Sequence, residues 1–206
     1  MRSESFFVPA GVGVAEIVEK RSRFIARVTP VCSEDDARAE IEHVRQRYHD
    51  ARHNCWCYIL RGGPERYSDD GEPQGTAGLP MLEVFRRGGI LDVCCVITRY
   101  FGGILLGAGG LSRAYAGASK QALEAAGIAE MRLWDCLEID CGYAILGKVK
   151  NEISAAGGVV ENIEYGENTV LCVFLPAGRA ESLNKRLADA SAGAVHGRVT
   201  GEIWRK

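Results

Sequence analysis

Two arginines, three aromatic residues and five glycines are concentrated in the segment 98–115, directly after a wholly apolar stretch at 93–97. Glycine is tolerated at this density where the backbone needs a positive φ or approaches a neighbour closely. A glycine-rich turn from a strand into a helix also directs unpaired N–H groups and the positive helix end to one point, which suits an anion. The residues concerned are Arg99, Tyr100, Phe101, Gly102, Gly103, Gly107, Gly109, Gly110 and Arg113.

The glycines also have a purely structural interpretation. They could form a tight turn that lets the following helix pack flat on its sheet, with Arg99 and Arg113 in solvent. The segment matches neither the P-loop pattern nor the dinucleotide-binding pattern, and it lacks the lysine that a P-loop needs. A phosphate cradle at 107–110 is therefore an alternative hypothesis.

Polar residues elsewhere in the chain could converge on the same place. His53 and Asn54 begin one expected strand, while Asp69, Asp70 and Glu72 lie in a long segment between elements. A histidine, carboxylates and an arginine in one cleft could carry out acid–base chemistry or hold a divalent cation through oxygen ligands. No Ser-His-Asp order, nucleophile elbow or H-E-x-x-H motif supports catalysis. We therefore expect a binding site, and we assign no catalytic residue and no metal ligand.

The acidic residues could instead be turn formers whose carboxylates pin the loop through Arg99 or Arg113. Burying Arg99 unpaired is strongly unfavourable, so a carboxylate from 69–72 is its expected partner. Arg99→Ala and Asp70→Ala are then expected to impair partner binding and to leave the fold largely intact. Tyr100 and Phe101 could stack on nucleic-acid bases, although aromatic residues that follow a buried strand more often pack in a core.

Hydrophobic periodicity predicts two α+β domains, residues 1–130 and 131–206, with the boundary near 128–134. The segment 62–80 is dense in Gly, Pro, Asp and Ser and is expected to be a long loop of functional or mobile character. In the first domain we expect strands at 14–18, 24–31, 54–60 and 93–98, and helices after Ser33, at 79–87 and from about 111 to Gly127. In the second we expect strands at 137–141, 159–165, 169–175 and 198–204, and helices at 146–156 and 180–190, which is the βαββαβ order of a ferredoxin-like unit.

Composition excludes several classes of protein. A formal net charge of −2 argues against a broadly basic nucleic-acid surface. No export signal or membrane-spanning run is evident, so we expect a cytoplasmic protein without a membrane partner. Most of the eight cysteines lie in apolar strands, where cysteine behaves as a small hydrophobe. The triplet His53, Cys55 and Cys57 lacks a second half-site, so neither a metal nor another cofactor is expected.

Several motifs, in this order and at this spacing, resemble the hallmark segments of the YigZ/IMPACT family over about residues 15–127. The resemblance implies a first domain with the fold of the second domain of a small-subunit ribosomal protein. It implies a second domain similar to the last domain of the translocation elongation factor. Arg52 departs from the family pattern, in which a small hydroxyl residue is common, and adds a cation at the edge of the cleft. The motifs are 20–26, 53–56, 68–73, 75–78 and the glycine-rich segment 98–115.

The resemblance also implies a link to translation. Eukaryotic members of this family act in translational control, where they compete with a stress-responsive kinase for its ribosome-associated activator. That specific partner depends on a flanking domain and is not transferred to this chain. The expected function is binding of RNA or a ribosome-associated protein without catalysis. The alternative is a nucleotide- or phosphate-binding protein, or an enzyme, that uses the glycine-rich turn and the cleft. The sequence does not predict the oligomeric state.

Overall fold

The computed structural model describes residues 5–206, which form an α+β protein of two compact units. One unit contains residues 6–130 and the other contains Ser5 and residues 131–206. Each unit has its own hydrophobic core. No helix within residues 5–206 is long and apolar enough to cross a membrane.

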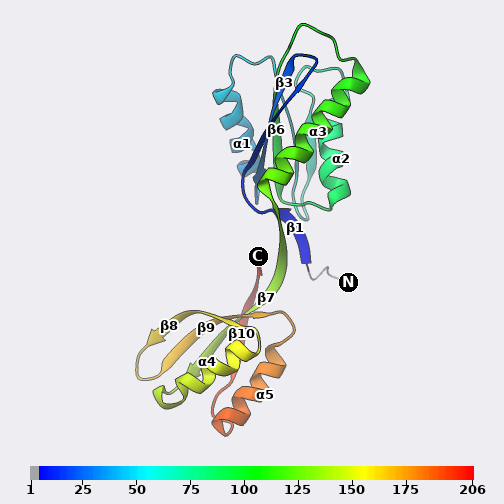
Figure 1. Cartoon of the computed structure of the whole chain (residues 1–206). Helices are drawn as coiled ribbons and strands as arrows, with labels where there is room; N and C mark the ends of the chain where they lie inside the picture. The colour runs from blue at the N-terminus through cyan, green and yellow to red at the C-terminus, as the bar shows by residue number, and fades with distance from the viewer. Residues whose placement is uncertain (1–4) are drawn as a thin grey trace. The chain divides into compact units, whose positions relative to one another are not determined.

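The first unit is built on a five-stranded sheet in the order β2-β3-β6-β4-β5, with antiparallel neighbours throughout (Figure 1). Because β3 and β4 both pair antiparallel with β6, they run parallel to each other on its two sides. The helix between them in sequence, α1, makes the βαβ unit that was expected. The strands are β2 (Gly13–Glu19), β3 (Ser22–Pro30), β4 (His53–Ile59), β5 (Glu65–Ser68) and β6 (Val93–Tyr100).

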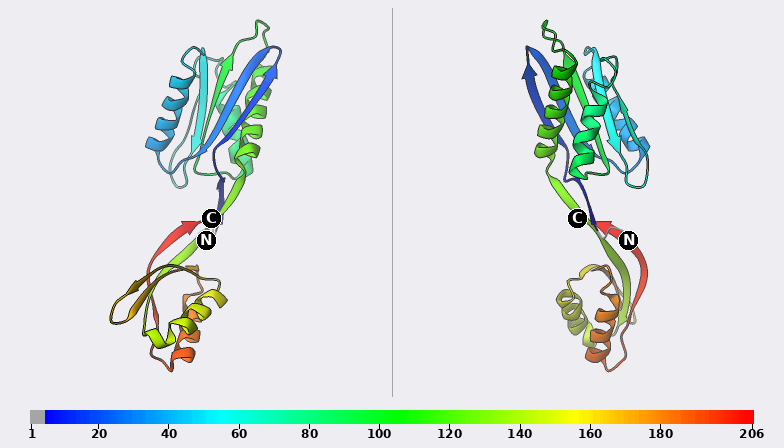
Figure 2. Two further views of the ribbon diagram at one scale, coloured as in Figure 1. Left: turned by 60° about the vertical axis from the view of Figure 1, so that its left-hand side comes forward. Right: turned by 90° about the vertical axis from the view of Figure 1, so that its right-hand side faces the viewer.

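Helices cover both faces of this sheet, as Figures 1 and 2 show. Helix α1 (Glu34–Arg47) lies on one face, while α2 (Gly78–Gly88) and α3 (Ala108–Ala126) lie on the other. Helix α1 begins where the sequence predicts, since the Ser33 side chain accepts a hydrogen bond from the Asp36 N–H at 3.1 Å.

Side-chain alternation along β4 decides which residues face which layer. Cys55 and Cys57 face α2 and α3, whereas Trp56 and Tyr58 face α1. Both faces of the strand are therefore largely buried. This confirms the prediction, from apolar residues at successive positions, that it is central.

The second unit has the strand order β10-β7-β9-β8 with antiparallel neighbours, which is the ferredoxin-like arrangement that was predicted. Its first strand starts earlier than expected, at Ile128, and β1 (Ser5–Pro9) also pairs with it although no strand was expected there. The elements are β7 (Ile128–Cys141), the short helix η1 (Tyr143–Ile145), α4 (Leu146–Ala155), β8 (Val159–Tyr165), β9 (Thr169–Pro176), α5 (Ala180–Ser191) and β10 (Gly197–Arg205).

The segment 62–80 is more ordered than its composition suggests. Four of its residues form β5, which pairs with β4 from Trp56↔Ser68 to Ile59↔Glu65. The expectation of a single long loop was wrong because β5 is a polar edge strand. Its pairing comes from the neighbouring strand and not from an apolar pattern of its own.

Candidate functional site

A pocket of about 480 Å³ lies in the first unit, where the start of β4, the end of β6 and the start of α3 meet. Its walls carry both charged and apolar side chains. The lining residues are Arg52, His53, Gly71, Glu72, Pro73, Arg99, Phe101, Leu105, Leu106, Gly107, Ala108 and Leu111. Of the residues proposed from sequence, His53, Glu72, Arg99, Phe101 and Gly107 therefore share one concave site.

A buried ion pair forms one wall of this pocket. Arg99 Nη1 lies 2.6 Å from Glu72 Oε1, and the two side chains are only 7% and 3% exposed. The Tyr115 hydroxyl donates a second hydrogen bond to the same carboxylate oxygen at 2.8 Å. The prediction that a carboxylate from 69–72 pairs with Arg99 is confirmed, and Glu72 is the residue that provides it.

The Arg99 guanidinium is held on its other sides as well. Its Nη2 lies 3.4 Å from Ser22 Oγ, and its central carbon lies 5.4 Å from the Phe24 ring centroid and 5.6 Å from that of Phe101. Its Nε is buried and has no hydrogen-bond partner among residues 5–206. The orientation of this cation is therefore fixed by the surrounding protein and not by solvent.

The N-terminus of α3 contributes a second positive element. Gly107 precedes the helix with φ +73°, and no side chain in the described part of the chain caps this end. Gly107 and Ala108 both line the pocket, so the first turn of the helix borders it. Unpaired N–H groups at a helix start, near Arg52 and Arg99, favour an anionic group of a ligand.

Three of the five glycines in the turn have a structural requirement. At Gly102 an added Cβ would lie 2.0 Å from the backbone carbon of Arg21, so the two backbones touch only because the side chain is absent. Gly103 and Gly107 have φ values of +83° and +73°. Gly109 and Gly110 lie within the first turn of α3, where neither has a positive φ.

Asp69 and Asp70 pin the loop, but through backbone N–H groups and Arg45 and not through Arg99 or Arg113 as the structural interpretation proposed. Asp69 accepts hydrogen bonds from the N–H groups of Gly75, Ala77 and Gly78 at 2.8–3.0 Å, where α2 begins. Asp70 accepts from the Asn54 N–H at 2.7 Å and from the Arg45 guanidinium at 2.9 Å. Its own backbone oxygen lies 2.9 Å from His53 Nδ1. These carboxylates hold β4 and the loop together, and the pocket wall is built on them.

Three further candidates lie elsewhere. Asn54 bonds to Thr98 at 2.7 Å, and Tyr100 donates to Asp50 at 2.7 Å, on the α1 side of the sheet. The alternation of β4 and β6 places them opposite His53 and Arg99, so the expectation of one cleft does not hold for them. Arg113 lines a different pocket, between α2 and α3.

Sequence reasoning missed Ser22, Phe24 and Tyr115 as parts of the site. Ser22 also accepts a hydrogen bond from the Gly102 N–H at 3.1 Å, which ties the glycine turn to the β2–β3 hairpin. Ser22 and Phe24 lie in a motif of the family resemblance, but nothing local indicated that they would contact Arg99. Only the pairing of β3 with β6, with Phe24 opposite Arg99, brings them together.

The cysteines of β4 are buried thiols. Burial raises the pKa of Cys55 to about 12, and burial raises the pKa of Cys57 well above its ordinary value. Cys55 Sγ lies 3.3 Å from the hydroxyl of Tyr115, the same hydroxyl that donates to Glu72 of the ion pair. Because their pKa values are raised in this way, both side chains are protonated packing groups near neutral pH.

The fold and the site thus define a two-unit α+β protein with an open pocket around a buried ion pair. A model of the Impact N-terminal domain matches residues 20–123, and a model of a domain of unknown function, DUF1949, matches residues 139–194. The chain is 35% identical over 191 residues to the IMPACT family member YvyE of Bacillus subtilis, covering 92% of this chain and 88% of that protein. It is 36% identical over 198 residues to the IMPACT family member YigZ of Escherichia coli, covering 93% and 96%.

A solved crystal structure, described as that of a hypothetical protein, is 34% identical to this chain. It matches with a TM-score of 0.63 and covers 97% of this chain and 98% of that one. The chain belongs to the IMPACT family.

Proposed function

We propose that this chain is a non-catalytic binding protein linked to translation, which recognises RNA or a ribosome-associated protein through the pocket at Arg99 and Glu72. One observation carries the proposal. The fixed Arg99 cation and the start of α3 lie beside apolar residues that solvent reaches, since Phe101 is 56% and Leu105 is 82% exposed. Exposed apolar groups around a polar centre are typical of a surface that a partner covers.

The chemistry of the pocket favours recognition over catalysis. Glu72 already accepts hydrogen bonds from both Arg99 and Tyr115, and Asp69 and Asp70 are occupied with the loop. A general base must reach a substrate proton, and both oxygens of Asp69 and of Asp70 already accept hydrogen bonds from the protein. Glu72 Oε1 accepts two hydrogen bonds, one of them from the Arg99 cation. An anionic group of a partner, with an apolar group beside it, fits the remaining positive and apolar walls.

The test is capture of ribosomal components from lysate with and without nuclease, using the full chain as bait. We expect ribosomal RNA or ribosome-associated proteins to be retained, and Phe101→Ala or Leu105→Ala to reduce their recovery by at least about fivefold. Arg87→Ala is the control, because this exposed arginine lines the other pocket, between α2 and α3. Recovery of no translation component, or equal recovery with all the variants, would contradict the proposal. Loss on nuclease treatment identifies RNA as the partner, and retention identifies a protein.

A nucleotide- or phosphate-binding role is the second candidate, and the uncapped start of α3 beside the pocket is the observation that favours it. A thermal-shift screen of nucleotides, with and without magnesium, tests it. A nucleotide at 100 times its dissociation constant adds about 2.7 kcal/mol to the stability. If common nucleotides do not shift the unfolding temperature while ribosomal components are captured, the first proposal stands and the nucleotide-binding role is ruled out.

A further inference from the structure

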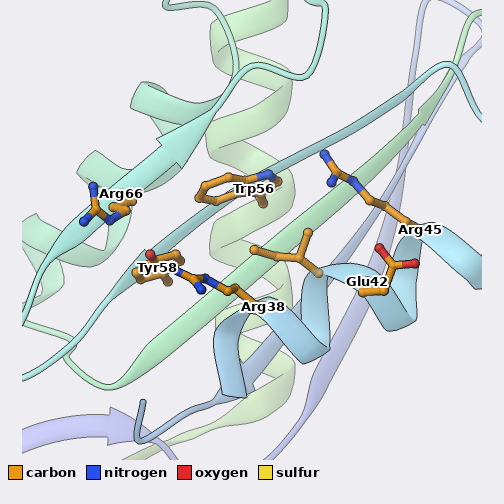
Figure 3. Close-up of a pocket in the computed structure, with 7 residues that line it drawn as sticks. Arg38, Glu42, Arg45, Trp56, Tyr58 and Arg66 are labelled. Atoms are coloured by element: carbon orange, nitrogen blue, oxygen red, sulfur yellow. The ribbon is translucent and has the colours of Figure 1, made fainter. Parts of the chain in front are cut away.

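A second groove lies on the opposite side of the same unit, between α1 and the strands β4 and β5. Its volume is about 550 Å³, and its walls are arginine and aromatic side chains (Figure 3). The lining residues are Arg38, Ile41, Glu42, Arg45, Trp56, Tyr58 and Arg66. None of them lines the pocket at Arg99.

Two aromatic rings are stacked against each other in this groove. Trp56 and Tyr58 lie on the same face of β4, with ring centroids 5.7 Å apart and ring planes within 9° of parallel. Trp56 is half-buried, so part of the indole is accessible from the groove, whereas Tyr58 is only 2% exposed and supports the indole from the core. Base stacking on aromatic side chains tolerates any sequence, because every base has a π-face.

Arginines from two elements, α1 and β5, surround these rings. Arg38 and Arg45 come from α1 and Arg66 comes from β5, and in Figure 3 Arg38 points toward Tyr58 and Arg45 toward Trp56. The lining carries these three cations and the single carboxylate of Glu42. Two further carboxylates, Glu34 and Asp70, pair with these arginines, so the groove offers exposed guanidinium donors within a locally balanced charge.

The arginines retain hydrogen-bonding capacity. Arg38 donates to Glu34 at 3.2 Å, Arg45 donates to Asp70 at 2.9 Å, and Arg66 lies 3.7 Å from Glu34. A guanidinium has five N–H donors, and these side chains are 69%, 41% and 58% exposed. Exposed guanidinium groups with spare donors bind phosphate oxygens in a bidentate manner.

We propose that this groove binds single-stranded RNA, with a base stacked on Trp56 and the adjoining phosphates on Arg38 and Arg66. The groove chemistry fits any single-stranded nucleic acid, and the choice of RNA rests on the proposed link to translation. The groove lies on the α1 side of the sheet and the pocket on the α2 and α3 side, so the two sites can be tested separately.

The experiment measures fluorescence anisotropy of labelled oligouridine and oligothymidine, each of about 15 nucleotides, with the purified full chain. We expect Arg38→Ala and Arg66→Ala each to weaken RNA binding about tenfold. Each should also lower the slope of log affinity against log salt, measured between about 50 and 200 mM, by about 0.7 for each phosphate that the variant no longer neutralises. Arg87→Ala is the charge-matched control and should change neither quantity.

A second readout keeps the stacking residue in place and measures the fluorescence of Trp56 itself. Replacing Trp134 and Trp204 with phenylalanine leaves Trp56 as the single tryptophan. Its fluorescence should be quenched as oligouridine saturates the groove.

Absence of saturable binding, or binding that Arg38→Ala and Arg66→Ala leave unchanged, overturns the proposal. Equal displacement of the oligonucleotide by polyglutamate also overturns it, because the groove would then take any polyanion. Equal affinity for the two oligonucleotides upholds the groove and overturns the choice of RNA. If only Phe101→Ala abolishes RNA binding, the pocket binds the RNA and the groove does not. If the groove variants abolish it while capture of ribosomal components fails, the groove stands and the proposed function does not.

Discussion

Replacing Arg99 with alanine is expected to lower the free energy of unfolding of the first unit by about 3–5 kcal/mol, the usual cost of breaking a buried ion pair from one side. The reason is that Glu72, only 3% exposed, would lose the cation that lies 2.6 Å away and stay buried without an ionic partner. From sequence alone this substitution was expected to leave the fold largely intact. The burial of both side chains changes that expectation. Urea unfolding measures the effect, followed by Trp56 fluorescence with Trp134 and Trp204 replaced by phenylalanine.

Two further variants make this result specific. Lys120→Ala removes an exposed pair with Glu124 on α3 and should cost less than about 1 kcal/mol. Combining Arg99→Met with Glu72→Leu and Tyr115→Phe should recover most of the loss, since apolar groups often replace a buried ion pair without penalty. The tyrosine is included because its hydroxyl would otherwise lose its acceptor on Glu72. A cost for Arg99→Ala no larger than that for Lys120→Ala would contradict the prediction.

Replacing Gly102 with alanine is expected to destabilise the first unit by at least about 3 kcal/mol, the upper end of what over-packing costs. The added Cβ would lie 2.0 Å from the Arg21 carbonyl carbon and 2.4 Å from the Ser22 nitrogen, which are backbone atoms that cannot rotate away. The turn must then move from the β2–β3 hairpin and lose the Gly102 N–H bond to Ser22. Urea unfolding and capture of ribosomal components should both decline.

The matched control substitution, Gly117→Ala, should raise the stability of the unit instead of lowering it. Gly117 lies inside α3 with open space around its Cα, so Gly117→Ala should add about 0.5–1 kcal/mol of stability. Equal effects of the two substitutions would show that the contact between Gly102 and Arg21 is not rigid.

The regular elements could be predicted from the sequence because their apolar residues repeat at the period of a strand or a helix. Helical spacing from Leu146 to Ala156 and alternation from Leu137 to Cys141 were enough to define the βαββαβ order of the second unit. The strands β1 and β5 could not be found in this way. In β5, Glu65–Ser68, polar residues form an edge strand whose conformation comes from pairing with β4.

The sequence also determined that Arg99 needs a carboxylate, because an unpaired buried cation is too unfavourable to persist. It could not decide among Asp69, Asp70 and Glu72. That choice depends on the path of the loop, in which Asp70 adopts φ +43° and Asp69 bonds to the start of α2.

Only the tertiary structure separated the candidate residues onto the two faces of the sheet. The sheet faces of β4 and β6 put His53 and Arg99 on one side and Asn54 and Tyr100 on the other, since neighbouring residues of a strand point in opposite directions. The groove of Trp56 and Arg38 likewise has no contiguous sequence signal. Its rings come from β4 and its cations from α1 and β5, and packing of these elements around one sheet brings them together.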